Sequence, residues 1–156
     1  MINFGHIGEG IYIGSAPQNS VDVARLKQMK VSAVISLQSD ADIKAFRIDW
    51  EKLQSAYSDK DMLCQRFPIA DFNEQDLARK LPDPVRALNE LRSSAHEVYV
   101  HCNAGICRAP ATVLAYLCHF KKMSVNEGLV FIRQQRPQAN PYIGAIELAL
   151  DALENS

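Results

Sequence analysis

The chain has 156 residues, of which 47% are hydrophobic and 22% charged, so it can bury a core as a single domain (1–156) without disulfides or bound metal. Its formal net charge of −1 lacks the basic excess of nucleic-acid binders, so nucleic acid is not an expected partner. The chain does not open on a basic segment followed by an apolar run, and no apolar stretch reaches the ~20 residues of a membrane span, so we expect a cytoplasmic protein that binds no membrane.

Strand-like and helix-like segments alternate along the chain. Short β-branched runs predict strands, and apolar residues three or four positions apart, such as Val23 and Leu26, predict helices. In chain order the pattern predicts a strand at 11–14, a helix at 21–29, a strand at 31–37, a helix at 48–57, a strand at 62–67, a helix from 82 or 83 to 92, a strand at 97–102 and a helix at 110–119.

Two further helices are predicted from their first residues. The sequence from Ser124 to Glu127 fits a capping box, in which each side chain accepts the backbone N–H of the other residue at the start of a helix. Asn140 and Pro141 suit the cap and the first position of the last helix. Alternating strands and helices over the whole chain predict an α/β layered domain.

The loop between the strand at 97–102 and the helix at 110–119 carries the strongest chemical signal. A tight loop that leads into a helix turns its backbone N–H groups inward, and the helix dipole adds partial positive charge at the same point. We therefore expect an anion site, which Arg108 completes with two parallel hydrogen bonds to an oxyanion. The predicted phosphate-binding residues are Asn103, Ala104, Gly105, Ile106, Cys107 and Arg108.

Cys102 is the candidate nucleophile of this loop. The four cysteines form no C-x-x-C pair of the kind found in zinc ribbons, and they should be reduced in a cytoplasm. Cysteines at helix N-termini ionise at a pH of roughly 3.5–7.5 instead of about 8.5, and a thiolate beside a bound phosphate can attack it in line. A buried structural cysteine with a surface arginine is the alternative, and it leaves the strand, the glycine and the helix unexplained.

With these residues the chain resembles the dual-specificity class of protein tyrosine phosphatases, whose signature is His-Cys-x5-Arg. It is similar in particular to the catalytic domain of the glucan phosphatases, which are the plant starch phosphatases and laforin. Residues 101–105 match the laforin-like loop, and 108–111 resemble the plant version. The resemblance covers nearly the whole chain, with further counterparts at 11–18, 37–40, 71–72 and 76–77.

The resemblance implies a central mixed sheet flanked by helices, no cofactor or metal, and a proton donor at Asp71. General acid help of this kind is worth about 10²–10⁴-fold in rate. Asp71 precedes Cys102 by 31 residues and follows the strand at 62–67, so its loop can lie over the nucleophile. Asp76 is the rival acid. Either aspartate could instead cap a helix, which suits Asp76 better because helical sequence follows it.

Several side chains have a supporting role in this interpretation. We expect His101 to hydrogen-bond the loop rather than to act as a base. The resemblance places Phe72 and Phe46 at the pocket, with core packing as the alternative for both. Two arginines form either a basic rim or ordinary solvated helix charges, at Arg133 and Arg136. Most such phosphatases carry Ser or Thr after the loop arginine, whereas this chain has Ala109.

The predicted function is hydrolysis of phosphomonoesters by a monomeric enzyme through a cysteinyl-phosphate intermediate, with phosphotyrosine and phosphoserine or phosphothreonine proteins as substrates. Two alternatives stay open, namely a phosphoglucan phosphatase and a non-catalytic phosphate-binding module. A rhodanese-like or arsenate-reductase enzyme also uses a looped cysteine and arginine. Arsenate reductases carry that loop near the N-terminus, however, whereas Cys102 lies two thirds along this chain.

Overall fold

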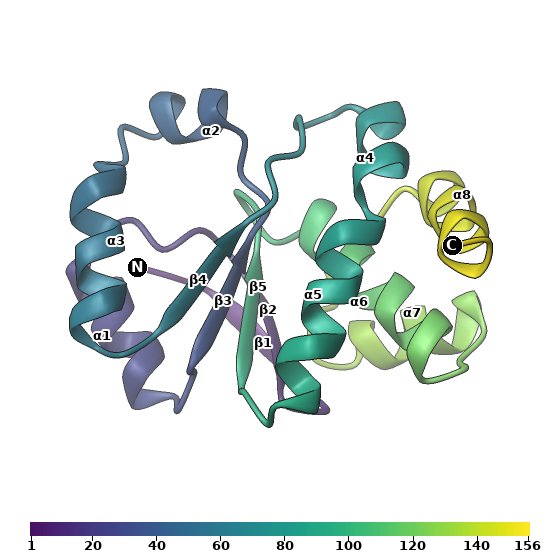
Figure 1. The fold of residues 1–156 in the computed structure, drawn as a ribbon, viewed down its shortest axis with the longest axis horizontal. Coiled ribbons are helices and arrows are strands. Elements are labelled where there is room, and N and C mark those ends of the chain that lie inside the picture. The colour runs from purple at the N-terminus through teal and green to yellow at the C-terminus, as the bar shows by residue number, and fades with distance from the viewer.

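The computed structural model describes residues 1–156, which form a five-stranded sheet with helices on both faces (Figure 1). The strands are β1 (Phe4–Gly8), β2 (Ile11–Gly14), β3 (Ala33–Ser36), β4 (Leu63–Arg66) and β5 (Val98–His101). Their order in the sheet is β1-β2-β5-β3-β4; β1 pairs antiparallel with β2, and all other pairs are parallel. The predicted α/β fold with a central mixed sheet is thereby confirmed.

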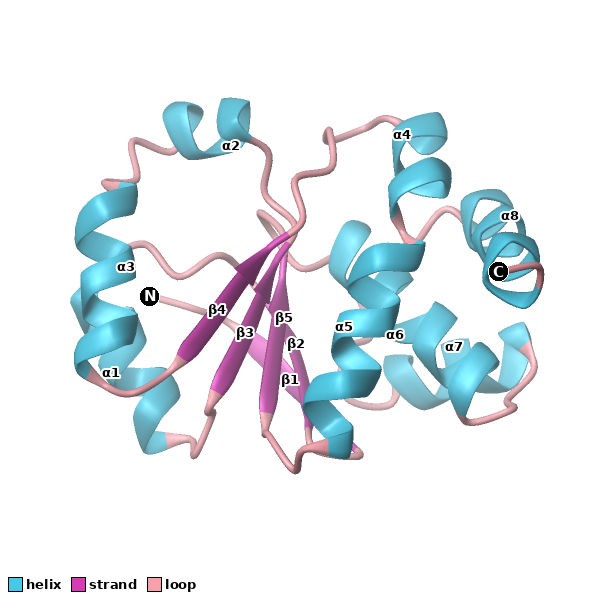
Figure 2. Cartoon of the chain, in the orientation of Figure 1, coloured by secondary structure: helices cyan, strands magenta, loops and turns pink.

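Two groups of helices cover the two faces of the sheet (Figure 2). On one side lie α1 (Ser20–Gln28) and α3 (Trp50–Asp59), and the short α2 (Asp40–Ala45) stands beyond the end of β3. On the other side lie α4 (Glu74–Lys80), α5 (Pro82–Ser93), α6 (Arg108–Phe120), α7 (Val125–Arg133) and α8 (Ile143–Glu154). None of these helices combines the length and the apolarity that crossing a membrane requires.

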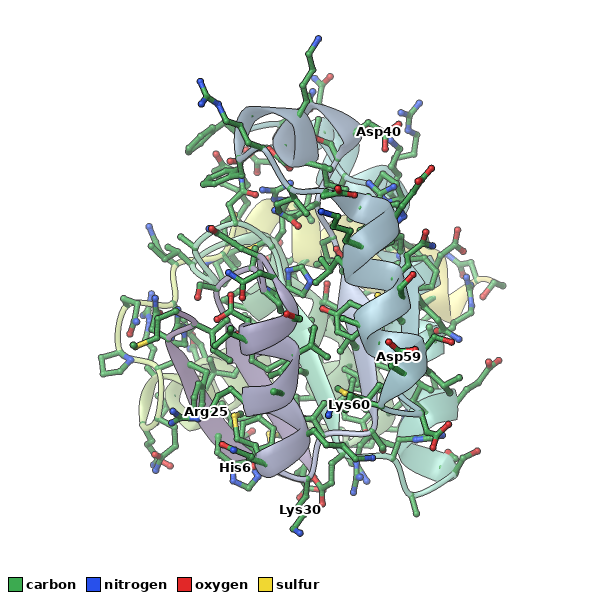
Figure 3. The ribbon with its side chains drawn as sticks, turned by 90° about the vertical axis from the view of Figure 1, so that its left-hand side faces the viewer. His6, Arg25, Lys30, Asp40, Asp59 and Lys60 are labelled. Atoms are coloured by element: carbon green, nitrogen blue, oxygen red, sulfur yellow. The ribbon has the colours of Figure 1, made fainter.

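Successive side chains of the central strands enter two different cores, as the twofold repeat of a strand requires. Tyr99 of β5 is one of the 11 buried residues on the α1–α3 side, whereas Val98 and Val100 are among the 29 buried residues on the opposite side. The face of the sheet covered by α5 and α6 therefore carries the larger core. Charged side chains such as Arg25 and Asp59 occupy the outer faces of α1 and α3 (Figure 3).

The ends of most predicted helices and strands lie within two or three residues of the observed ends. The capping box at Ser124 is confirmed, because Ser124 and Glu127 each accept the backbone N–H of the other. The last predicted helix is present as α8, but its predicted cap at Asn140 and first position at Pro141 are wrong, since the cap is Tyr142 and α8 begins at Ile143. The N–H of Asn140 donates instead to the carbonyl of Ile106 (2.6 Å), which holds this segment against the loop before α6. The sequence pattern did not predict β1, α2 or α4.

The topology gathers three segments at one edge of the sheet. Strands β2, β5 and β3 are parallel neighbours, so their carboxyl ends lie side by side. The residues that follow Gly14, Ser36 and His101 therefore meet at that edge, which is where ligands bind in sheets of this kind.

Candidate active site

The loop of residues 102–107 connects β5 directly to α6. Gly105 adopts a left-handed backbone (φ 70°), which only glycine adopts without strain. A Cβ atom at this position would also lie 2.5 Å from the carbonyl oxygen of Gly14. The glycine predicted inside the loop is thus required by both its conformation and its neighbour.

Every backbone carbonyl of this loop accepts a hydrogen bond from a group outside the cup that the loop forms. Arg136 donates two of these bonds, from Nη2 to Ala104 (2.7 Å) and from Nε to Gly105 (3.0 Å). The other donors are His101 Nδ1 to Cys102 (2.9 Å), Ala16 N–H to Asn103 (2.9 Å), Asn140 N–H to Ile106 (2.6 Å) and Ala111 N–H to Cys107 (2.9 Å).

These bonds decide where the N–H groups of the loop point. In a trans peptide the C=O and N–H of one unit point in opposite directions, and six outward carbonyls therefore turn the N–H groups of residues 103–108 inward. None of these six N–H groups donates to an acceptor within the protein. The loop therefore presents a cup of free donors that suits an anion, and the need for a partner is greatest where the residue is buried, as at Gly105 and Arg108.

Arg108 begins α6 and is held from one side. Its side chain is 3% exposed, and its Nη1 donates to Asp42 Oδ2 (2.6 Å), the carbonyl of Ile69 (2.7 Å) and the carbonyl of Leu37 (3.4 Å). Its Nε is buried without a hydrogen-bond partner. The guanidinium therefore keeps one edge, formed by Nε and Nη2, for a ligand.

Asp42 is the residue of this site that the sequence did not single out. It is the third residue of α2, where it forms a capping box with Ser39, and its side chain is 11% exposed. Burial alone would raise its pKa, but hydrogen bonds from Arg108, Asn103 and the Ser39 N–H lower the pKa below its ordinary value. The sequence signal for Asp42 was the capping box that opens a six-residue helix, which was not recognised.

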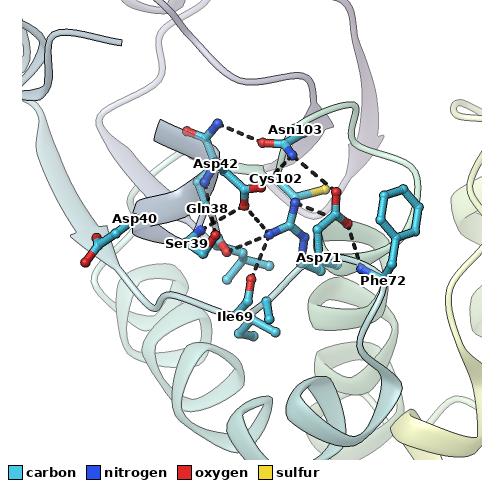
Figure 4. Close-up of polar contacts among 12 residues, drawn as sticks. Gln38, Ser39, Asp40, Asp42, Ile69, Asp71, Phe72, Cys102 and Asn103 are labelled. Atoms are coloured by element: carbon cyan, nitrogen blue, oxygen red, sulfur yellow. Dashed lines mark hydrogen bonds and ion pairs between the residues drawn. The ribbon is translucent and has the colours of Figure 1, made fainter. Parts of the chain in front are cut away.

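Asp71 lies on the opposite side of the guanidinium, at the position predicted for the proton donor. Its Oδ1 is 3.3 Å from Arg108 Nη2, and its Oδ2 accepts a 3.2 Å hydrogen bond from the Asn103 side chain. The same amide of Asn103 also donates to Asp42 (3.0 Å), so two carboxylates, one arginine and one asparagine close a ring. Figure 4 shows this ring, with the sulfur of Cys102 pointing toward Asp71.

Asp76, the rival acid, does not join this ring. It is the third residue of α4, whose cap is Asn73, and it forms ion pairs with Arg79 (2.9 Å) and Lys80 (3.1 Å). The Ala70 N–H donates to its carboxylate and, with these cations, lowers its pKa although burial acts in the opposite direction. Asp76 therefore ties the loop that carries Asp71 to α4.

His101 is fully buried and neutral near pH 7. Burial, together with the positive charges of Arg108 and Arg66, lowers its pKa to about 4, against the effect of its hydrogen bond to Cys102. Because a carbonyl can only accept, Nδ1 carries the proton in that bond. The side chain of His101 thus supports the loop by donating to the backbone carbonyl of Cys102, as the sequence led us to expect.

The two phenylalanines are on the surface. Phe72 is 88% exposed and follows Asp71, and Phe46 is 46% exposed at the end of α2. Plain core packing is therefore excluded for Phe72. Arg136 departs from both of its predicted roles, since it is buried beneath the loop and forms neither a rim nor a solvated charge. All four cysteines are free thiols, and Cys102 itself is buried.

Comparisons with known proteins agree with this geometry. Residues 11–150 match the family model of the dual specificity phosphatase catalytic domain. The chain is 30% identical over 131 residues to the phosphoglucan phosphatase LSF1 of Arabidopsis thaliana, and 30% identical over 132 residues to the dual specificity protein phosphatase Mpk3 of Drosophila melanogaster. Each match covers 84% of this chain but only 22% and 29% of the relative, so the chain spans less than a third of either protein.

A similar fold occurs in solved structures. The crystal structure of the human tyrosine phosphatase-like serine/threonine/tyrosine-interacting protein superposes with a TM-score of 0.78 at 19% identity, and the match covers 98% of each chain. At that identity the likeness concerns the fold.

Proposed function

Since this chain belongs to the dual-specificity phosphatase family, we propose that it hydrolyses phosphomonoesters of proteins through a cysteinyl-phosphate intermediate on Cys102. Phosphotyrosine and phosphoserine or phosphothreonine are the proposed substrate groups. The observation that carries the proposal is the cup of six free N–H groups, because every carbonyl of residues 102–107 is held outward by an external donor.

In this mechanism the cup and the open edge of Arg108 hold the three non-bridging oxygens of the phosphoryl group. Oriented amides and a fixed cation stabilise developing negative charge without any reorganisation during the reaction. Nε of Arg108 has no competing partner, and Nη2 exchanges Asp71 for a phosphate oxygen. Two parallel hydrogen bonds of this kind fix the orientation of the group as well as its position.

The proposed chemistry has two steps. The sulfur of Cys102 attacks phosphorus, the bond from phosphorus to the ester oxygen breaks, and Asp71 gives its proton to the leaving oxygen. Asp71 then takes a proton from a water molecule, the water oxygen attacks phosphorus, and the bond between sulfur and phosphorus breaks. Inorganic phosphate leaves and the thiolate returns. Asp71 suits both steps because its side chain is 27% exposed and its hydrogen bonds are long.

A phosphoglucan is the second candidate substrate, because a relative at 30% identity carries that activity in its name and an exposed phenylalanine beside the site is compatible with it. Phe72 is 88% exposed beside Asp71, and exposed apolar faces next to a polar site mark a binding surface. Such a ring can pack against the flat face of a sugar, and equally against the ring of phosphotyrosine. A relative of this chain is a phosphoglucan phosphatase by name.

The test is release of phosphate from p-nitrophenyl phosphate, a panel of phosphopeptides and a soluble phosphoglucan, with EDTA and a reductant present. We expect turnover by the natural chain and none by Cys102→Ser, which should still bind inorganic phosphate. Phosphate binding without any turnover by the natural chain would instead assign a non-catalytic phosphate-binding module. A cytoplasmic location and a monomeric state stay predictions.

A further inference from the structure

The two edges of Arg108 differ in a way that the proposed chemistry does not by itself require. All three contacts shorter than 3.5 Å made by Nη1 are with Asp42, Ile69 and Leu37. Nε has no partner, and Nη2 faces only Asp71. One edge is therefore fixed in the resting protein, while the other is available to a ligand.

The two carboxylates beside Arg108 also differ. Asp42 is 11% exposed, lies 2.6 Å from the guanidinium, and uses both oxygens, since Oδ2 also accepts the Ser39 N–H and Oδ1 accepts the Asn103 amide. Asp71 is 27% exposed and makes contacts of 3.3 and 3.2 Å. Short contacts to a charged group that is out of water are much stronger than long, partly solvated ones. Asp42 is thus the fixed partner, and Asp71 is the one that gives way.

This difference matters because Asp71 and an incoming phosphate need the same edge of Arg108. Without a second carboxylate, only the neutral carbonyls of Ile69 and Leu37 hold Nη1. The charged Asp71 can then draw the guanidinium into a pair with both of its nitrogens, which is the preferred arrangement of such pairs. In that arrangement the phosphate would lose its clamp and the leaving group its proton donor. A fixed carboxylate at Nη1, in addition to these carbonyls, opposes that turn.

We propose that Asp42 is a positioning residue for Arg108, which holds the guanidinium with its Nε–Nη2 edge toward Cys102 and keeps it from being captured by Asp71. The inference rests on the proposed function, because it assigns Arg108 to the phosphoryl group. The cost is that Asp42 offsets part of the positive charge of Arg108. A phosphate dianion still finds six N–H donors in the cup, so orientation outweighs the lost attraction.

The experiment compares Asp42→Asn with Ser39→Ala. Both changes disturb the capping box of α2, but Ser39→Ala leaves the pair of Asp42 and Arg108 intact. We measure the affinity for inorganic phosphate and kcat and KM for p-nitrophenyl phosphate. A misplacement of about 1 Å costs on the order of 10²-fold in catalysis. We therefore expect Asp42→Asn to lower kcat/KM about 10²-fold and to weaken phosphate binding, while Ser39→Ala stays within about threefold of the natural chain.

The competition with Asp71 provides a readout that a purely structural role would not change. In a protein that already carries Asp71→Asn, the capturing carboxylate is absent, so Asp42→Asn should weaken phosphate binding far less than it does in the natural chain. Equal weakening in both backgrounds would overturn the proposal, and so would equal effects of Asp42→Asn and Ser39→Ala. If Asp42→Asn does not fold, Asp42→Glu keeps the charge and displaces the carboxylate by one methylene, and normal phosphate affinity of that variant would overturn the proposal.

The phosphate-binding measurement separates this inference from the proposed function. An inactive natural chain would contradict the proposed reaction, yet the binding comparison between the two backgrounds would still test whether Asp42 positions Arg108. If the natural chain is active and the Asp42→Asn variant binds phosphate with normal affinity, only the inference about Asp42 is contradicted.

Discussion

Arg136 offers the sharpest test of how the loop is built, because one side chain orients two of its peptide units. It holds the carbonyls of Ala104 and Gly105, and the N–H groups of those same peptide units belong to Gly105 and Ile106. Replacing Arg136 with Met keeps an unbranched apolar stem and removes all of the donors. The variant should therefore lose stability and also loosen the cup.

The magnitude follows from the groups left behind. A buried acceptor that loses its partner costs about 1–3 kcal/mol, which applies to the carbonyl of Gly105, whereas the carbonyl of Ala104 is partly exposed and adds less. The third acceptor, Oδ1 of Asn3, is near water and adds little. A domain has a total stability of about 5–15 kcal/mol, so the variant should fold with a reduced margin. Loss of one oriented donor typically lowers kcat about 10²–10³-fold, and we expect at least the lower value here.

Urea unfolding gives the stability of each variant. Hydrolysis of p-nitrophenyl phosphate, measured without urea and well below the melting temperature, gives kcat/KM of the folded protein. Arg133→Met is the control. Arg133 is exposed, ends α7 only three residues earlier, and donates to Ala139 without touching the loop. Arg136→Met with reduced stability but normal kcat/KM and phosphate affinity would refute the view that this guanidinium orients the cup.

Three further outcomes follow from the structure. His101 takes up a proton near pH 6.5 in the unfolded chain but only near pH 4 in the folded chain, so the free energy of unfolding should fall by about 2 kcal/mol between pH 7.5 and 5. Urea unfolding of His101→Asn, whose amide can replace Nδ1 as the donor, should lack this part of the pH dependence. An unchanged profile would contradict the neutral histidine. Gly105→Ala should cost at least about 1–2 kcal/mol for the left-handed backbone and should abolish phosphate binding in calorimetry, because its Cβ would meet the carbonyl of Gly14; normal binding would show that the loop can shift. Asp71→Asn should slow alkyl phosphates far more than aryl phosphates with good leaving groups, whereas equal losses on both would point away from Asp71 as the acid.

Local sequence rules were sufficient for the loop and for most elements around it. The strand before Cys102, the glycine within the loop and the helix after Arg108 are encoded within ten neighbouring residues, and the capping box at Ser124 is encoded within four. Such features depend on backbone conformation close in sequence, which residue type constrains directly.

The elements that were missed are short or lack an apolar face. Helices α2 and α4 have six and seven residues, and each relies on a cap, at Ser39 and Asn73, rather than on a periodic apolar pattern. Strand β1 contains two glycines, which made it a poor strand candidate. Its hairpin to β2 turns through Glu9 and Gly10, both with positive φ, which is the pattern of a two-residue type I′ turn.

The partners of Arg108 and of the loop carbonyls could not be predicted from local sequence. Asp42 precedes Arg108 by 66 residues, and Arg136 follows Gly105 by 31. Which of many charged residues reaches the loop depends on the order of the strands in the sheet and on the path of the chain after α7. The same dependence explains why both roles expected for Arg136, a basic rim or a solvated helix charge, place it on the surface although it is buried.

Asn3 gives the first residues of the chain an unexpected part in this arrangement. Its backbone exchanges hydrogen bonds with Ser15, and its side chain accepts a 2.8 Å bond from Arg136, the same guanidinium that supports the loop. Any change that removes or displaces Asn3 would thus alter the position of Arg136, and through this one side chain the orientation of the loop that forms the phosphate cup.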